Sequence, residues 1–136
     1  MTVANVVEHQ RAWVEGLNRG DVSAANGVFA TDCTVHITGV AQPIQGVAAW
    51  KEFMAGFLTA FPDLHFTTED QLTDGPRVAI RWRATGTHRG PLGPVPPTGR
   101  SIAVGGLIID RLEGGMVAER WEQWDQPGML QQLGLG

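Results

Sequence analysis

The hydrophobic pattern changes its period once along the chain, and this change constrains the fold more than any other feature. Up to Phe61, apolar residues recur at three- and four-residue steps, the spacing of amphipathic helices. From Leu64 to Trp124, apolar residues mostly alternate with polar ones, the spacing of β-strands. Because the two kinds of segment are segregated, the sequence predicts an α+β fold with helices on one face of a curved antiparallel sheet.

The composition favours one globular domain spanning residues 1–136. The chain is 43% hydrophobic and 18% charged, which suits a protein with a single core. A net charge of -4, with Lys51 as the only lysine, argues against nucleic acid as a partner. One cysteine, Cys33, excludes an internal disulfide. No signal peptide and no apolar run of ~18 residues is present, so we expect a cytoplasmic protein with no membrane partner.

Three helical segments are expected before the period changes. The first carries an apolar stripe and ends at Asn18–Gly20; its members are Val3, Val6, Val7, Trp13, Val14 and Leu17. Asp21 is a predicted N-cap for a short second helix that reaches Phe29. The third helix carries Trp50, Phe53 and Phe57, which either belong to the core or form the roof of a cavity against the sheet.

Five strands are expected: one between the helices and four after them. These are Thr34–Thr38, Leu64–Leu72, Arg77–Gly86, Ser101–Arg111 and Met116–Trp124. The strand 101–111 is apolar on both faces, so we expect both faces to be covered. Residues 88–100 are rich in glycine and proline and predict an irregular connection, and residues 127–133 predict a short terminal helix.

The last strand combines charges with tryptophans. Alternation places Arg120, Glu122 and Trp124 on one face, with Glu119 and Trp121 on the other. If the first face lines a pocket, apolar surroundings should raise the pKa of Glu122 toward neutrality, as a general base requires. Alternatively, Arg120 and Glu122 are solvated charges on an edge strand. Asp125 is predicted to cap the terminal helix.

The histidines are candidates of different kinds. His36 either faces the pocket, where it could polarise a carbonyl or shuttle a proton, or is a polar group at its rim. His65 is either a second pocket group or part of a polar interface. His88 belongs to a glycine-rich turn, where stabilising the loop is the expected role. Their spacing matches no metal-binding motif, so no metal is expected.

Several motifs together resemble the SnoaL-like polyketide cyclase (ester cyclase) family. They are Phe61-Pro-Asp-Leu-His-Phe66, Val78-Ala-Ile-Arg-Trp82, Gly86-Thr-His-Arg-Gly90, Pro96-Pro-Thr-Gly-Arg100, Trp121-Glu-Gln-Trp-Asp125 and Gln132-Leu-Gly134. The resemblance implies a nuclear transport factor 2-like cone with one deep internal pocket, in a homodimer formed through the outer sheet face. Trp82 and Trp121 are expected on that outer face.

The resemblance also implies a chemistry. Members of the family close rings in aromatic polyketides by aldol condensation, without metal or cofactor, using a carboxylate on the last strand. That position falls on Glu122, where the cyclases have aspartate, and the position of their histidine falls on Ile108. We therefore expect Glu122 and His36 to be catalytic and a small hydrophobic substrate to contact the pocket wall. The expected wall residues are His65, Arg120, Trp124, Ile108, Trp50, Phe53 and Phe57.

The sequence is compatible with three functions. The first is a cofactor-free acid/base enzyme on a small apolar carbonyl compound, performing ring closure or an isomerase-like proton transfer, with Glu122 as the base. The second is epoxide hydrolysis, known on the same cone, which requires an Asp-Arg-Asp cluster that the sequence does not locate. The third is a non-catalytic module that holds a hydrophobic ligand, with Glu122 as a hydrogen-bonding anchor.

Overall fold

The computed structural model describes the backbone of residues 3–136 and the side chains from residue 8 onward. Its elements, in chain order, are α1 (Val3–Asn18), the 3-10 helix η1 (Val22–Ala25), β1 (Phe29–Ile37), β2 (Ile44–Gln45), α2 (Val47–Ala60), β3 (His65–Asp74), β4 (Arg77–Thr87), β5 (Ser101–Glu113), β6 (Met116–Trp124) and α3 (Gln126–Gln132). The predicted stripe members Val3, Val6 and Val7 lie outside the residues whose side chains are described.

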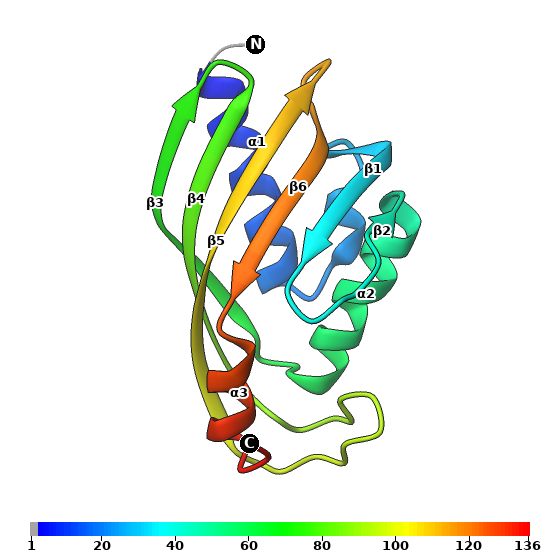
Figure 1. Cartoon of the computed structure of the whole chain (residues 1–136), viewed down its shortest axis with the longest axis vertical. Helices are drawn as coiled ribbons and strands as arrows, with labels where there is room; N and C mark the ends of the chain where they lie inside the picture. The colour runs from blue at the N-terminus through cyan, green and yellow to red at the C-terminus, as the bar shows by residue number, and fades with distance from the viewer. Residues whose placement is uncertain (1–2) are drawn as a thin grey trace.

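A single curved sheet organises the molecule, and α1 and α2 lie behind it in Figure 1. The strand order is β2-β1-β6-β5-β4-β3, so the sheet remains unclosed. The α+β class is confirmed, but the sheet is mixed, not wholly antiparallel, because β1 pairs with β6 in parallel. No hairpin joins these two strands, so no turn dictates their relative direction. This pairing also makes β6 an internal strand, with β1 on one side and β5 on the other.

The segment between the first two helices differs from its prediction. Val28 and Phe29 do not continue the short helix, because Gly27 adopts a φ of 84° and β1 begins at Phe29. The segment before α2 contains the two-residue strand β2, which the sequence analysis did not predict and in which Gln45 pairs with Thr34. Strand β1 is therefore longer than its β-branched centre suggests.

An aromatic cluster fills the space between the helices and the sheet. Trp13 of α1 meets Phe29 of β1 edge to face, with ring centroids 5.3 Å apart. Trp50 of α2 packs on both, at 6.2 Å from Trp13 and 5.8 Å from Phe29. All three side chains are buried. Edge-to-face and tilted contacts are the arrangements that aromatic quadrupoles favour, so this cluster fixes α1 and α2 against the sheet.

The alternation of β4 is confirmed, and it corrects one assignment. Val78, Ile80 and Trp82 are buried on the inner face, whereas Arg77, Arg81 and Arg83 on the opposite face are exposed. Trp82 therefore faces the interior, and its expected place on the outer face is wrong. The other tryptophan expected there, Trp121, does lie on the outer face, where it stacks on His36.

Strand β5 is covered on only one face in this chain. Leu107 and Ile109 point outward and are 60% and 45% exposed. The expectation that both faces of this strand are covered is therefore not met within one copy of the protein.

The irregular connection and the terminal helix close the lower end of the sheet in Figure 1. The buried His88 accepts a hydrogen bond at Nδ1 from the amide of Thr98, and the amides of Arg89 and Gly90 donate to the carbonyl of Ala60 at the end of α2. Asp125 caps α3 as predicted, accepting from the amide of Gly128 at 2.9 Å. Within residues 3–136, no helix has the length and apolar character needed to cross a membrane.

Candidate active site

The cavity between the helices and the inner sheet face has two adjoining parts. We call them the aromatic chamber and the polar chamber. Both are lined by Met54, Phe66, Trp82 and Glu122. Glu122 is the only ionisable side chain common to the two walls. A ligand in either chamber therefore meets the same carboxyl group.

The aromatic chamber lies between α2, α3 and the sheet. Its cavity volume is about 50 Å³. Glu122 is the only charged residue in a wall that is otherwise apolar, formed by Ile37, Phe53, Met54, Phe57, Phe61, Leu64, Phe66, Trp82, Ala84, Ile102, Val104, Trp124 and Met129. Phe57 stands edge-on to Trp124, with ring centroids 5.9 Å apart. Such a narrow aromatic space favours flat, apolar molecules.

The polar chamber lies between α1 and the sheet. Glu122 and Arg120 enter it from β6, Ile108 from β5, and Gln10 and Trp13 from α1. Arg120 is almost completely buried, and its guanidinium carbon lies 4.9 Å from the centre of the Phe29 ring. The aromatic cluster that packs α1 and α2 against the sheet thus also contacts the charged guanidinium group of Arg120.

Arg120 is paired with Asp110, the residue opposite it on β5. Its Nε and Nη2 atoms donate to the two carboxylate oxygens of Asp110 at 2.7 and 2.9 Å. Nη2 also reaches Oε1 of Gln10 at 3.5 Å. A buried charge is tolerated when it is paired and hydrogen-bonded, and this two-point contact meets that requirement.

Glu122 is buried at the junction of the two chambers. It lies opposite Ile108 on β5 and Ile37 on β1, and it is 7% exposed. Burial is the main reason that the pKa of Glu122 is raised to about 7; Arg120 opposes this effect and the charge of Asp110 adds to it. The Arg120 Nη1 atom is 3.8 Å from Glu122 Oε1, too far for a hydrogen bond. The carboxyl group therefore has a cation nearby that is already paired elsewhere.

Most of the residues expected at the site come together there. Trp124, Phe53 and Phe57 line the aromatic chamber, whereas Arg120, Ile108 and Trp50 line the polar chamber. The expectation that Arg120 and Glu122 share an inward face is met, and the alternative of solvated charges on an edge strand is excluded by their burial.

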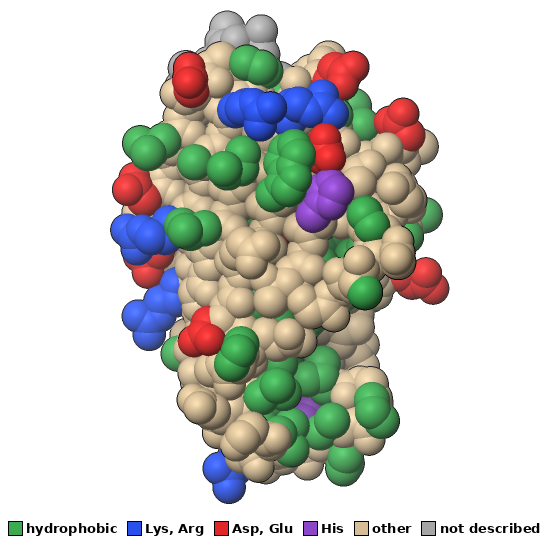
Figure 2. All heavy atoms as spheres, viewed as in Figure 1, with side chains coloured by type: hydrophobic (Ala, Val, Ile, Leu, Met, Phe, Trp, Pro, Cys, Tyr) green, Lys and Arg blue, Asp and Glu red, His purple; other side chains and the backbone are tan. Residues whose placement is uncertain are grey.

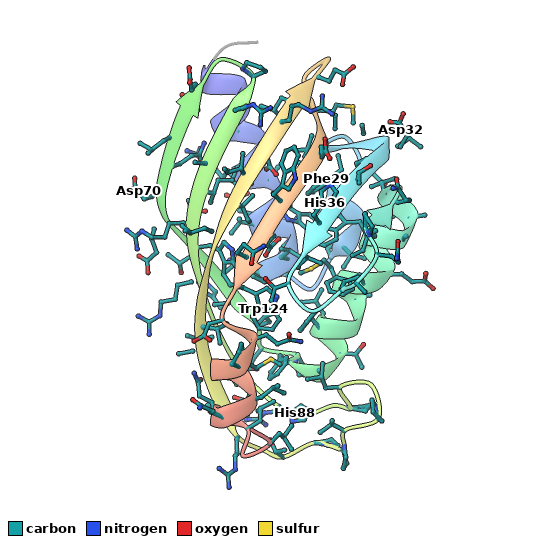
Figure 3. The ribbon with its side chains drawn as sticks, viewed as in Figure 1. Phe29, Asp32, His36, Asp70, His88 and Trp124 are labelled. Carbon is teal, nitrogen blue, oxygen red and sulfur yellow. The ribbon has the colours of Figure 1, made fainter. Side chains whose placement is uncertain are left out.

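The structure places the two predicted site histidines away from the cavity. Val35 and Ile37, the neighbours of His36 on β1, are both buried, so His36 between them faces outward. Its Nε2 atom lies 2.7 Å from Glu119 Oε2, and its ring stacks on Trp121 at 5.5 Å. Figure 3 marks His36 on β1 and Trp124 farther down, at the end of β6. His65 is exposed on β3 and lines neither chamber. Neither histidine belongs to the pocket wall.

Two residues of the site did not emerge from the sequence: Trp82 in the wall, and Asp110, which pairs with the wall residue Arg120. Trp82 follows Val78 and Ile80 at two-residue steps, and that alternation places it inward. Asp110 likewise follows Ile108 by two residues, but its role depends on the register of the β5–β6 hairpin, which pairs it with Arg120. Within the described part of the chain, no three His, Cys, Asp or Glu side chains gather closely enough to hold a metal ion.

An α+β cone with a carboxyl group in an aromatic cavity defines a known class of small proteins. The sequence profile of the SnoaL-like polyketide cyclase family matches residues 7–133. The chain therefore belongs to the SnoaL-like polyketide cyclase family. No curated protein sequence matches it.

Solved structures with the same fold are numerous. IdmH from Streptomyces antibioticus, provisionally a polyketide cyclase, is 30% identical, with a TM-score of 0.82 over 94% of this chain and 97% of its own. AclR from Streptomyces galilaeus, provisionally a hydroxylase, is 27% identical, with a TM-score of 0.87 over 99% of this chain and 88% of its own. TsrD from Streptomyces laurentii, at 23% identity, covers 100% of this chain and 99% of its own with a TM-score of 0.90, which establishes the common fold.

Proposed function

We propose that this protein is an acid/base enzyme that closes a ring in a small, flat, apolar carbonyl compound. One observation carries the proposal: Glu122, with a pKa of about 7, is the only charged residue in the aromatic chamber. Membership of the polyketide cyclase family and 30% identity with IdmH support the same reaction class.

A pKa near 7 suits both halves of such a reaction. Near neutral pH, Glu122 is present in comparable amounts as the carboxylate and as the acid. The carboxylate removes a proton from a carbon next to a carbonyl group, and the electrons of the broken C–H bond form an enolate. General acid and base groups work best when their pKa lies near the working pH.

Ring closure returns the proton. The enolate carbon attacks a second carbonyl carbon of the same molecule, a C–C bond forms, and the electrons of that carbonyl become an alkoxide. The alkoxide then takes a proton from the Glu122 carboxyl group, which restores the carboxylate. The atoms and electrons balance within the substrate and Glu122, so this sequence consumes no co-reactant.

The pair of Arg120 and Asp110 keeps Glu122 in this state. An unpaired guanidinium 3.8 Å away would hold the carboxyl group ionised and weaken it as a base. Because Asp110 engages two nitrogens of Arg120, part of that effect is offset, and burial is the largest influence on the pKa of Glu122. We assign Arg120 and Asp110 as positioning residues.

The test uses synthetic linear 1,5-diketones that carry an aryl group, with ring closure followed by chromatography and mass spectrometry. Glu122→Gln should slow cyclisation at least ~100-fold, the lower range for loss of a general base. The matched control Glu119→Gln changes a carboxylate of the same strand on the opposite face and should leave the rate within about twofold. Full turnover by Glu122→Gln would refute the proposal; diketone binding without turnover by the wild type would favour a ligand-holding module.

Epoxide hydrolysis is a second candidate because the structure assembles a carboxyl-arginine-carboxyl cluster from Asp110, Arg120 and Glu122. In that reaction, the acid form of Glu122 would protonate the epoxide oxygen as its C–O bond breaks, water would add to the carbon, and the proton that this water loses would return to the Glu122 carboxylate. Both oxygens of Asp110 are engaged by Arg120, which leaves Glu122 as the one free carboxyl group of the cluster and favours ring closure. Incubation with styrene oxide separates the two, since only hydrolysis gives a diol.

We also propose that a second copy of this chain covers the outer sheet face. One cross-strand row on this face runs Leu72, Ala79, Ile109, Trp121 and His36 across five strands. Figure 2 shows hydrophobic side chains gathered across this face beside a histidine. A contiguous apolar row on a sheet is a typical protein contact surface. The row is flanked by charges, with Arg111 bonded to Glu119 on one side, so two copies could meet through a hydrophobic centre and a polar rim.

A further inference from the structure

Two tryptophans flank a glycine on the inner side of the sheet. Trp82 of β4 and Trp124 of β6 are both direct neighbours of Gly106 on β5. A Cβ atom on Gly106 would lie 2.6 and 2.7 Å from Cζ2 and Cε2 of Trp82, so the indole ring covers the glycine. The glycine thus leaves room for the indole ring of Trp82 to lie over β5, in the direction of Trp124 on β6. Both rings line the aromatic chamber.

Each of these tryptophans carries a buried donor that is not used. The Nε1 atoms of Trp82 and Trp124 are buried and have no hydrogen-bond partner among the described residues. Buried indole N–H groups normally find a partner, and leaving one without a partner is costly. Trp50 Nε1, in the polar chamber, has no partner among the described residues either, but only Trp82 and Trp124 of these three tryptophans line the aromatic chamber.

The position of the two donors relative to Glu122 indicates a role for them. Trp124 follows Glu122 by two residues on β6, so their side chains are neighbours on the inner face. Trp82 shares both chambers with Glu122. When Glu122 removes a proton next to a carbonyl group, negative charge develops on the carbonyl oxygen, two bonds from the reacting carbon. Donors fixed beside the base stabilise that charge most when they lie in a water-poor site.

We infer that the indole N–H groups of Trp82 and Trp124 form an oxyanion site that binds the carbonyl and enolate oxygen of the substrate. The inference rests on the proposed function. It assigns to the two indole N–H groups the role of polarising a carbonyl group, which the sequence analysis gave to a histidine. Neutral donors suit this task because they cannot lose or gain a proton near neutral pH. The substrate class narrows accordingly to flat molecules with an oxygen acceptor on the edge of a ring.

The donors can be observed directly with a phenol as the probe. In ¹H–¹⁵N spectra, the five tryptophans give five indole signals, which backbone-linked experiments assign in the wild-type protein. We expect 2-naphthol to move the Trp82 and Trp124 protons downfield, whereas 2-methylnaphthalene, which has the same shape and no acceptor oxygen, should not. The Trp121 signal, from the outer face, serves as the internal reference.

Affinity gives the second measurement. Trp82→Phe and Trp124→Phe should each weaken 2-naphthol binding by about fivefold, the factor of one hydrogen bond, while 2-methylnaphthalene binding changes less than twofold. If Trp82→Phe does not fold, the wild-type spectra and the affinity of Trp124→Phe for 2-naphthol still test the inference. The inference is overturned if 2-naphthol moves the two signals no further than 2-methylnaphthalene does, or if 2-naphthol does not bind.

The two proposals fail separately. Loss of turnover in Glu122→Gln, together with unmoved indole signals, would remove the oxyanion site and keep the acid/base assignment. Downfield shifts that persist in Glu122→Gln, together with undiminished turnover, would keep the oxyanion site and remove Glu122 as the base.

Discussion

Replacing Glu122 with glutamine should make the protein more stable at alkaline pH, and the gain should depend on pH in a defined way. The substitution keeps the size of the side chain and removes its titration. In the folded protein the pKa of Glu122 is raised from 4.5 to about 7. Between these values, the folded state binds more protons than the unfolded state. The stability of the wild type therefore falls as pH rises through this window.

The magnitude follows from the size of the shift. One pKa unit corresponds to about 1.4 kcal/mol, so ionising Glu122 in its buried position costs about 3 kcal/mol once the pH is above 7. Glutamine does not incur this cost. The difference in unfolding free energy between Glu122→Gln and the wild type should therefore increase by about 3 kcal/mol from pH 4.5 to pH 8.5 and then level off.

Urea unfolding followed by tryptophan fluorescence, at half-unit pH steps, measures this difference without a substrate. Glu119→Gln is the matched control. Hydrogen bonds, first from His36 and then from Arg111, lower the pKa of Glu119 below its ordinary value. The ionised Glu119 side chain therefore stabilises the folded protein above the ordinary pKa, and this stabilisation is lost as pH falls. The control should therefore lose stability relative to the wild type only as pH rises to about 4.5, the ordinary pKa of this group, and the difference should then stay constant up to pH 8.5. A flat difference for Glu122→Gln would mean that Glu122 titrates as an exposed carboxyl group, which would refute its role as a buried base.

Three further predictions follow from the same wall of the cavity and from the outer face. Asp110→Asn should release Arg120 to pair with Glu122 and lower the pKa of Glu122 by about one to two units, measured by carboxyl ¹³C NMR; an unchanged pKa would show that Asp110 does not offset the arginine. Gly106→Ala should destabilise the protein by about 1–3 kcal/mol in thermal or urea unfolding, because its Cβ overlaps the indole ring above it, and a neutral effect would contradict that packing. Ile109→Glu should convert a dimer to a monomer in light scattering at matched concentration, and a monomeric wild type would remove the proposed interface.

The sequence predicted the inward carboxyl group because alternation on one strand requires no knowledge of its neighbours. Arg120, Glu122 and Trp124 share a face whatever lies beside β6. The same rule was sufficient for Trp82, which alternates with two aliphatic residues, so its assignment to the outer face was an error of interpretation. His36 is a similar case, since the apolar residues on either side of it indicated an outward direction.

Other features depend on contacts between distant segments. The pairing of Asp110 with Arg120 depends on the register of the β5–β6 hairpin, which contains an irregularity between Arg111 and Leu112. The parallel direction of β1 depends on a partner strand near the other end of the chain, and no local propensity encodes it. The unpaired indole donors require knowledge of every neighbour of Trp82 and Trp124, which the sequence alone does not supply.

The parallel pairing of β1 with β6 has a consequence for how the protein is made. His36 and Glu119 meet across this pair although 83 residues separate them in the chain. During synthesis, β1 emerges early and must wait for nearly the whole chain before its partner exists. Contacts of such long sequence separation form slowly, because a large loop must close first. The strand that carries Glu122 is thus the last strand to be made, and a truncated chain lacking it would leave an edge of β1 exposed, open to pairing with other chains.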